Sequence, residues 1–202
     1  MLVLSTEHYL ERRLKLENKV IIRGRVIYNR IEAPPYLIRV RTEKGKYIDS
    51  PCVEFESPCD VRVGDFVSIK GELSKGYNYR DNKVVGSYMF IRGLEYKTLE
   101  KIWDPIEEKY LEPVSDNNFN VTGILRATHP ETDVLTLIRL DVHGIVIEIS
   151  AFLDMSERAR KLKKGDTVFV NGKIQTVRKA RKRDGVLTTF EMPVAAYIKT
   201  IE

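Results

Sequence analysis

Short segments in which apolar and polar residues alternate occupy most of the chain, and Gly, Asp, Asn or Pro residues separate them. A period of two is typical of half-buried β-strands, because successive side chains of a strand point to opposite faces. The pattern predicts five strands in the first half, at residues 20–31, 36–43, 46–56, 65–73 and 84–96. It predicts five more in the second half, at residues 119–128, 134–142, 144–152, 166–177 and 187–201. We therefore expect an all-β protein.

The two halves of the chain repeat each other. The stretch VGDFVSIKGEL at 63–73 matches KGDTVFVNGKI at 164–174, and NKVIIRGRV at 18–26 matches NNFNVTGIL at 117–125. A duplicated unit of about 100 residues explains both matches, and two copies are too few for a solenoid. The expected parts are a first domain with an N-terminal extension at 1–98, a connector at 99–116 and a second domain at 117–202.

Each half has the strand count of an OB-fold, a small barrel of five strands. The order of that fold places a helix between the third and fourth strands. MSERARKLKKG predicts such a helix in the second half, with Asp154 or Ser156 as N-cap and Gly165 at its C-terminal end. The corresponding segment of the first half, SPCDVRVG, is short and contains a proline, so we expect a loop there. The sequence therefore predicts two tandem five-stranded OB-fold barrels.

The connector carries a helical signature. In TLEKIWDPIEEKYLEP, Asp104 is placed as an N-cap, Pro105 takes the first helical position and Pro113 marks the end. The apolar residues of this segment, Trp103 among them, would form a stripe that packs against a barrel. The alternative role for Trp103 is to stack on a base. We expect a short helical connector between the two barrels.

The net charge of +5 is distributed unevenly. Residues 1–98 carry +5, residues 99–116 carry −4 and residues 117–202 carry +4, so two basic segments flank an acidic connector. Basic surfaces attract nucleic acid or anionic membranes. The longest stretch without Asp, Glu, Lys or Arg has nine residues, whereas a membrane span needs about 20 apolar residues. With no signal-peptide pattern and only two cysteines, we expect a cytoplasmic protein.

No catalytic or metal-binding pattern is visible in the sequence. His8, His129 and His143 lie far apart, and Cys52 and Cys59 have no second pair at zinc-ligand spacing. Nucleotide-binding loops and the usual hydrolase and protease signatures are absent as well. We expect no cofactor, no metal and no enzymatic activity.

Two hairpin segments hold candidate binding residues. SKGYNYRDNK at 74–83 carries Tyr77 and Tyr79 among cations, and its counterpart TVRKARKRDG at 176–185 carries cations without an aromatic residue. An unstacked base can stack on a tyrosine ring, which contributes about 1–3 kcal/mol per base, while cations hold the phosphates. This composition favours a nucleic-acid contact over a plain connecting loop.

Arginines alternate on two neighbouring strands of the first half. Arg23 and Arg25 share one face of the first strand, and Arg39 and Arg41 share one face of the second, since residues two apart point to the same side. Together they predict a basic stripe on the first barrel. The alternative interpretation is structural, because an exposed sheet face must be polar in any case.

The second half resembles the bacterial single-stranded DNA-binding protein family. The residues that carry the resemblance are Asn118 to Gly123, ERARKLKKGDTVFVNGKIQT at 157–176 and the basic loop before Asp184-Gly185. The layout is also similar to the primosomal relative of that family, which consists of the OB-fold alone. The first half shares NKVIIRGRV and VGDFVSIKGEL but lacks the helix. The resemblance implies a tandem duplication of the family's domain.

The resemblance further implies that a single strand binds across the sheet face and the hairpin before the last strand of each barrel. In the second hairpin, Lys179 stands where the family usually has an aromatic residue, which implies electrostatic contacts there. Phe152 lies one residue out of register with a stacking position of the family. The residues expected to contact nucleic acid are Lys75, Tyr77, Tyr79, Arg80, Lys83, Arg23, Arg25, Arg39, Arg41, Phe152, Arg178, Lys179, Arg181, Lys182 and Arg183.

These features predict sequence-independent binding of single-stranded DNA in replication, recombination or repair. There are two alternatives: an OB-fold assembly module that binds protein partners, and an RNA-binding OB protein, because nothing in the sequence distinguishes DNA from RNA. The expected partners are single-stranded DNA, or RNA, together with replication or recombination proteins. We also expect a homodimer, because four barrels give a strand a longer track.

Overall fold

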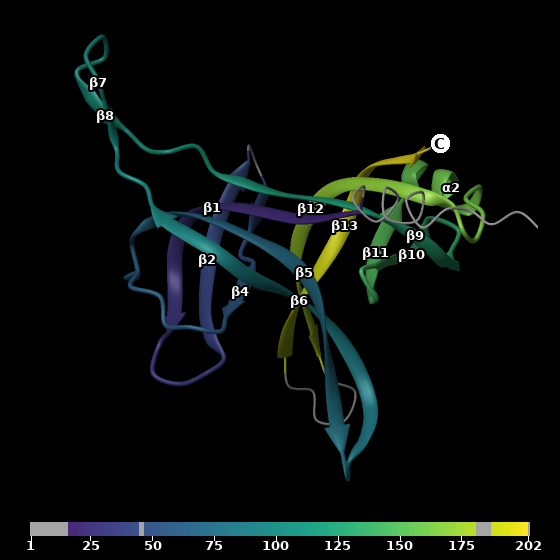
Figure 1. The fold of residues 1–202 in the computed structure, drawn as a ribbon. Coiled ribbons are helices and arrows are strands. Elements are labelled where there is room, and N and C mark those ends of the chain that lie inside the picture. Colours follow the sequence, from purple (N-terminus) through teal and green to yellow (C-terminus); the bar gives the residue numbers. More distant parts are fainter. Residues whose placement is uncertain (1–15, 45–46, 181–186, 202) are drawn as a thin grey trace, which may run out of the picture. The chain divides into compact units, whose positions relative to one another are not determined.

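The computed structural model describes residues 16–44, 47–180 and 187–201, and these are almost entirely β-structure (Figure 1). The strands of the first half are β1 (Glu17–Arg30), β2 (Tyr36–Lys44), β3 (Tyr47–Asp49), β4 (Cys52–Phe55), β5 (Phe66–Arg80), β6 (Lys83–Thr98), β7 (Ile102–Asp104) and β8 (Lys109–Leu111). Those of the second half are β9 (Asp116–Thr132), β10 (Leu135–Val142), β11 (Ile145–Phe152), β12 (Thr167–Ala180) and β13 (Leu187–Ile201). Within the described residues the single helix is α2 (Asp154–Arg160). The prediction of an all-β protein is confirmed.

The chain divides into two compact units. We call residues 19–119 and 173–193 the β1–β6 unit, and residues 120–172 and 194–201, with 16–18, the β9–β13 unit. Strands β12 and β13 are long, and their hairpin ends are part of the β1–β6 unit. The domain boundaries drawn from the sequence repeat stay a prediction.

The strands of the β1–β6 unit pair in the order β1-β5-β6-β4-β2, and β2 pairs with β1 again. Four of these pairings are antiparallel, and the one between β4 and β6 is parallel. The side chains that point inward are apolar and fully buried, as the alternating pattern predicts: Val20, Ile22, Ile38, Val53, Ile69 and Ile91. Burial of this one face drives the assembly of the strands.

The β9–β13 unit has the same pairing order. It runs β9-β12-β13-β11-β10, β10 pairs again with β9, and the contact between β11 and β13 is parallel. Its buried side chains also alternate along each strand, and they include Val121, Leu125, Ile138, Leu140, Ile147, Ile149, Val168 and Val170. Helix α2 packs at one end of this unit, against β10 and β11.

A glycine in the first strand of each unit allows a close approach of the second strand. A Cβ atom on Gly24 would lie 2.1 Å from the backbone oxygen of Arg41, and one on Gly123 would lie 2.8 Å from that of Asp141. No other residue fits at such a contact without displacing the backbone. The two contacts also identify Arg41 and Asp141 as structurally corresponding positions.

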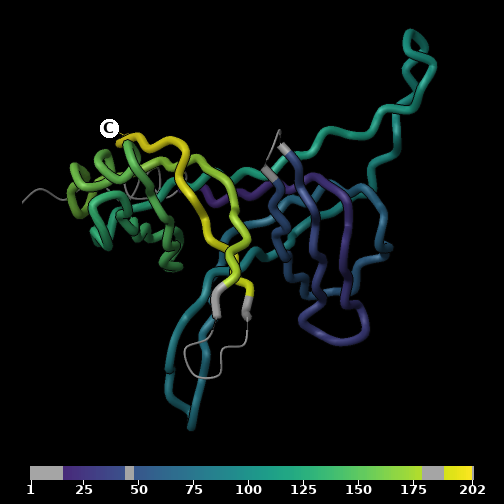
Figure 2. Tube along the Cα trace, turned by 180° about the vertical axis from the view of Figure 1, so that it is seen from behind, coloured from purple at the N-terminus to yellow at the C-terminus, as the bar shows by residue number. Residues whose placement is uncertain are grey.

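The connector is a β-hairpin, so the predicted helix is wrong. Strands β7 and β8 pair with each other, and both views show the hairpin standing away from the other strands of its unit (Figures 1 and 2). Asp104 accepts backbone hydrogen bonds from Ile106 (2.9 Å) and Glu107 (3.3 Å). Asp followed by Pro therefore begins a turn here, because the side chain that caps a helix can equally close a turn.

Trp103 is not part of the core, contrary to the expected packing against a barrel. Its ring lies 5.0 Å from the ring of Tyr110 on the opposite strand, and its side chain is 49% exposed. A cross-strand aromatic pair of this kind stabilises a hairpin by about 0.2–1 kcal/mol. The local pair thus favours the hairpin over a short helix, which is marginal in water without tertiary packing.

Helix α2 lies where the sequence predicts it, but its start differs. The N-cap is Leu153, with φ 50° and no capping side chain, and Asp154 lies in the first turn, where its charge suits the positive helix end. Ser156 is buried and shares a hydrogen bond of 2.8 Å with Thr136. The helix ends at Arg160, so Gly165, with φ 95°, belongs to the following turn.

The segment between β4 and β5 has no helix, which confirms the predicted loop. Across the residues that the structure describes, no helix has the length and apolar character required to cross a membrane.

Candidate nucleic-acid interface

Strands β5 and β6 continue past the sheet as a two-stranded ribbon. Their pairing extends from Ser74 opposite Phe90 to Arg80 opposite Lys83, with one register shift between Asn78 and Tyr79 (Figure 1). The turn consists of Asp81 and Asn82 alone, with φ values of 50° and 59°. Asp and Asn tolerate this left-handed conformation, which two-residue hairpin turns require. The segment that looks like a loop in the sequence is therefore mostly paired strand.

One face of the ribbon presents the two predicted tyrosines. Leu73 is buried, and Lys75, Tyr77 and Tyr79 follow at every second position, so they continue the inward face of β5. Beyond the core this face is open, and Tyr77 and Tyr79 are 49% and 67% exposed. The Lys75 ammonium lies 5.7 Å from the ring centre of Tyr77. This face thus combines two accessible rings with a cation.

The opposite face of the ribbon carries the other two predicted cations. Arg80 and Lys83 are cross-strand partners on this side, together with Tyr88 and Phe90. The ring of Tyr88 covers Gly76, where a Cβ atom would lie 2.4 Å from it, and lies 6.0 Å from the ring of Phe90. The structure therefore separates the predicted hairpin residues onto two faces. Tyr88 was not a sequence candidate, although its period-two spacing from Phe90 was a usable signal.

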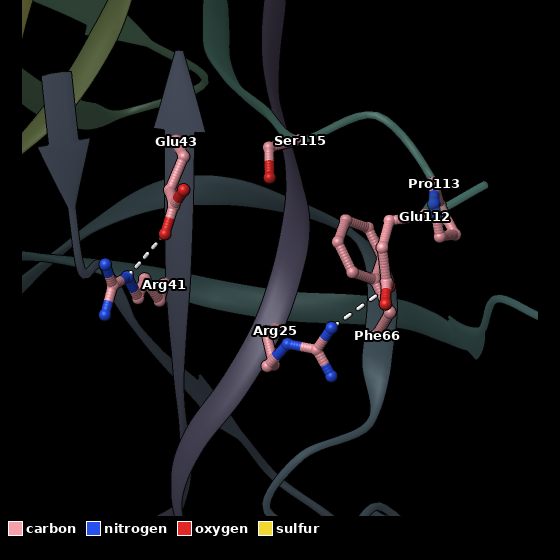
Figure 3. Close-up of a pocket in the computed structure, with 7 residues that line it drawn as sticks. All are labelled: Arg25, Arg41, Glu43, Phe66, Glu112, Pro113 and Ser115. Carbon is pink, nitrogen blue, oxygen red and sulfur yellow. Dashed lines mark ion pairs between the residues drawn. The ribbon is translucent and has the colours of Figure 1, made fainter. Parts of the chain in front are cut away.

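Three residues form a row across neighbouring strands of the β1–β6 unit. Arg25 on β1 lies opposite Arg41 on β2 and opposite Phe66 on β5. Opposite residues of antiparallel strands point to the same side, and Figure 3 shows the three side chains around one cavity. The cavity has a volume of about 400 Å³, and its remaining lining residues are Glu43, Glu112, Pro113 and Ser115. The predicted placement of Arg25 and Arg41 on one face is thus observed.

Both guanidinium groups of this row are paired with carboxylates. Arg25 donates to the backbone oxygen of Gly64 (2.8 Å) and lies 3.0 Å from Glu112, and Arg41 lies 2.6 Å from Glu43. Two arginines directly opposite each other repel. The carboxylates compensate this repulsion, and all four side chains are roughly half exposed.

The other two predicted arginines differ from this pair. Arg23 is exposed and makes a long hydrogen bond of 3.4 Å to Ser68. Arg39 is only 24% exposed, donates to the backbone oxygen of Ser50 (2.8 Å) and lies 3.8 Å from Glu191. Arg39 therefore helps to hold β13 against β2 and β4, and the four arginines do not form one even stripe.

Glu191 is a buried carboxylate inside the β1–β6 unit. It accepts hydrogen bonds from the backbone N–H of Cys52 (3.1 Å) and the hydroxyl of Thr176 (3.2 Å). Burial raises the pKa of Glu191 to about 7, against the opposing effects of the Cys52 N–H and Arg39. Sequence analysis missed this residue, because only the tertiary fold brings β13 beside β4.

The remaining candidates are only partly covered by the described residues. Arg178 is exposed on β12, and Phe152 is half-buried at the end of β11, opposite Leu135. The side chain of Lys179 and the whole of Arg181, Lys182 and Arg183 lie outside the described residues.

Metal-binding and thiol chemistry find no support in the described part of the chain. It contains no group of three or more His, Cys, Asp or Glu side chains that could hold a metal ion. Cys52 and Cys59 are free, and burial raises the pKa of each thiol to about 11. Both thiols are therefore protonated at neutral pH, which makes them poor nucleophiles.

No protein-family model matches the chain, and no curated protein matches its sequence. Among solved structures, the chain is similar to the wild-type single-stranded DNA binding protein from Thermus aquaticus, with a TM-score of 0.63 and 15% identity over 93% of this chain and 94% of that one. A deletion mutant of the same protein gives a TM-score of 0.62 and 15% identity over 94% and 96% of the two chains. The chain therefore has the fold of this single-stranded DNA binding protein over nearly its whole length, as the predicted resemblance implies.

Proposed function

We propose that the protein binds single-stranded DNA without sequence specificity, in replication, recombination or repair, and that it is a binding protein rather than an enzyme. Each unit acts as a five-stranded OB-fold barrel in this proposal, which the ring-like pairing order of both units supports. The likeness to a single-stranded DNA binding protein supports the same function. We expect it to act in the cytoplasm.

The observation that carries the proposal is the β5–β6 ribbon. Tyr77 and Tyr79 are exposed on one face of the two-stranded ribbon, with Lys75 beside Tyr77. Two accessible rings close together on one face can each stack a base, and each stacked base would contribute about 1–3 kcal/mol. Stacking tolerates any base, which accounts for binding without sequence specificity.

Phosphate contacts would come from cations on both repeats. The proposed set comprises Lys75, Arg80, Lys83, Arg23, Arg25, Arg41 and Arg178, with Lys179, Arg181, Lys182 and Arg183 included on the basis of the sequence. Arg39 and Phe152 are weaker members, because each is largely enclosed by its own unit.

A second candidate function is the binding of protein partners, and the connector hairpin favours it. Ile102, Trp103 and Ile106 are exposed on this hairpin, Ile106 by 91%. Exposed apolar side chains grouped on a projecting element are typical of protein contacts. Replication or recombination proteins, or a second copy of the chain in a homodimer, are the proposed partners.

The test is a titration of fluorescent dT and rU oligomers at two salt concentrations. The logarithm of the binding constant should fall with the logarithm of salt by about 0.7 for each phosphate neutralised. Comparison of dT with rU decides between DNA and RNA. Absence of binding at low salt, or a flat salt response, contradicts the proposal and favours the protein-binding function.

A further inference from the structure

Two cations of the β1–β6 unit converge on one carboxylate. The Arg25 guanidinium lies 3.0 Å from Oε2 of Glu112, and the Lys101 ammonium lies 2.7 Å from its Oε1. The hydrogen bond from Lys101, with the charge of Arg25, holds the pKa of Glu112 below its usual value. Glu112 is therefore an anion at neutral pH, held between two donors that match the oxygens of a phosphate equally well.

The cavity beside this carboxylate also has an aromatic wall. Phe66 lies directly opposite Arg25 in the β1–β5 pairing, so its ring and the guanidinium belong to the same face. Phe66 and Glu112 both line the cavity, and Figure 3 shows Arg41 on the other side of Arg25. Neighbouring strands lie about 4.8 Å apart. Arg25 on β1, which binds the carboxylate, thus lies one strand away from Phe66 on β5, and a nucleobase could stack on the Phe66 ring.

We propose that this cavity is a single-nucleotide subsite, in which one phosphate of a bound strand replaces the Glu112 carboxylate between Arg25 and Lys101 and the attached base lies against Phe66. This inference rests on the proposed binding of single strands. It adds Lys101 and Phe66 to the interface, and it makes Glu112 an internal competitor for the phosphate. When a phosphate takes this place, the ion pair between Arg25 on β1 and Glu112 of the connector breaks, so the connector separates from β1.

The decisive variant is Glu112→Gln, tested in the full chain with a fluorescent dT oligomer. Removal of the carboxylate frees Arg25 and Lys101 for a phosphate, so affinity should rise about two- to tenfold, as expected when two exposed ion pairs no longer compete. The salt dependence should steepen by up to about 0.7, because one more phosphate contact releases counterions.

The matched control is Glu107→Gln. Glu107 lies in the turn of the hairpin that Glu112 directly follows, is similarly exposed and pairs with Lys109, and neither of these two residues lines the cavity. Both variants lose one negative charge, so a general charge effect would raise their affinities equally. The inference requires the gain to be confined to Glu112→Gln and to disappear when Lys101→Gln is added.

Trp103, the single tryptophan of the chain, provides a second readout. It lies on the hairpin that Glu112 follows, so its emission in free Glu112→Gln should already approach that of the strand-bound wild type. Equal affinities of the two glutamine variants, or weaker binding by Glu112→Gln, would overturn the subsite. Absence of strand binding by every variant would instead overturn the proposed function.

Discussion

The two units share one pairing order but differ in charge at corresponding positions. Arg41 and Asp141 both lie over the strand glycine of their unit, and their cross-strand partners are Arg25 and Ile124. The face that carries two arginines in the β1–β6 unit therefore carries one aspartate and one isoleucine in the β9–β13 unit.

Arginines of the β9–β13 unit are paired with carboxylates, as Arg25 and Arg41 are in the β1–β6 unit. Arg126 pairs with Asp141, and Arg139 lies 2.9 Å from Glu148. The hydrogen bond from Arg126 lowers the pKa of Asp141, which keeps this carboxylate charged. One fold thus supports two electrostatic surfaces, because the fold depends on the buried face of each strand and the surface charge depends on the exposed one. We expect the β1–β6 unit to be the stronger binder.

The ribbon gives the largest expected effect. Tyr77→Ala combined with Tyr79→Ala should weaken binding of a dT oligomer by at least about 30-fold, because two stacking contacts are lost. The salt dependence should stay unchanged, since no charge is removed. Fluorescence titration at several salt concentrations measures both quantities.

Two controls sharpen this result. Tyr88→Ala removes a ring from the opposite face and should have a smaller effect if the strand follows the Tyr77 face. Serine substitutions of Arg178, Lys179, Arg181, Lys182 and Arg183 should flatten the salt dependence instead. Equal changes of slope in the tyrosine and cation variants would contradict this division of roles.

The next effect concerns stability and the buried carboxylate of the β1–β6 unit. The pKa of Glu191 is raised from 4.5 to about 7, which corresponds to a cost of about 3 kcal/mol when the group is ionised. Because the folded pKa exceeds the unfolded one, stability should fall as pH rises from about 4.5 to 7 and then level off. Denaturant unfolding between pH 4 and 8 measures this change.

Glu191→Gln should remove this pH dependence and be the more stable protein at pH 8. The matched control is Glu148→Gln in the β9–β13 unit, where the carboxylate is partly exposed and pairs with Arg139. If the stability of the wild type is instead constant between pH 4 and 8, Arg39 keeps Glu191 ionised over this range.

The smallest effect comes from exchanging the corresponding face residues. Arg25→Ile with Arg41→Asp gives the β1–β6 unit the residues of the other unit, and should weaken binding about tenfold, because charge-assisted phosphate contacts are lost. The salt slope should fall by about 1.4 for two contacts. The reciprocal change, Ile124→Arg with Asp141→Arg, should strengthen binding slightly. Loss of binding in both exchanges would mean that surface charge does not explain the difference between the units.

Much of the fold was predictable from local pattern. All ten predicted strands are present, with a break at Ser50 and Pro51 that divides the third into β3 and β4. The helix α2 and the loop that replaces it in the first half are present as well. These elements follow from period-two burial, turn residues and segment length, which act over a few neighbouring residues. The connector shows the limit, because Asp104 and Pro105 suit a turn and a helix start equally well.

The candidate site was predictable in composition more than in arrangement. The sequence located Tyr77, Tyr79, Arg25 and Arg41, but it could not assign Arg80 and Lys83 to the other face of the ribbon. That assignment depends on the two-residue turn at Asp81 and Asn82, which fixes the register of β5 with β6.

The sequence by itself determined the β-strands, the repeated pattern of the two halves and the residue types available for binding, because alternation and spacing are local properties. Only the tertiary structure decided which basic side chains are already paired with carboxylates and which remain available to contact a ligand. Arg39 pairs with Glu191, which lies on a strand about 150 residues further along the chain. Arg25 and Lys101 both pair with Glu112 of the connector. Such pairings form between segments distant in sequence, and the folded backbone alone brings their side chains within hydrogen-bonding distance.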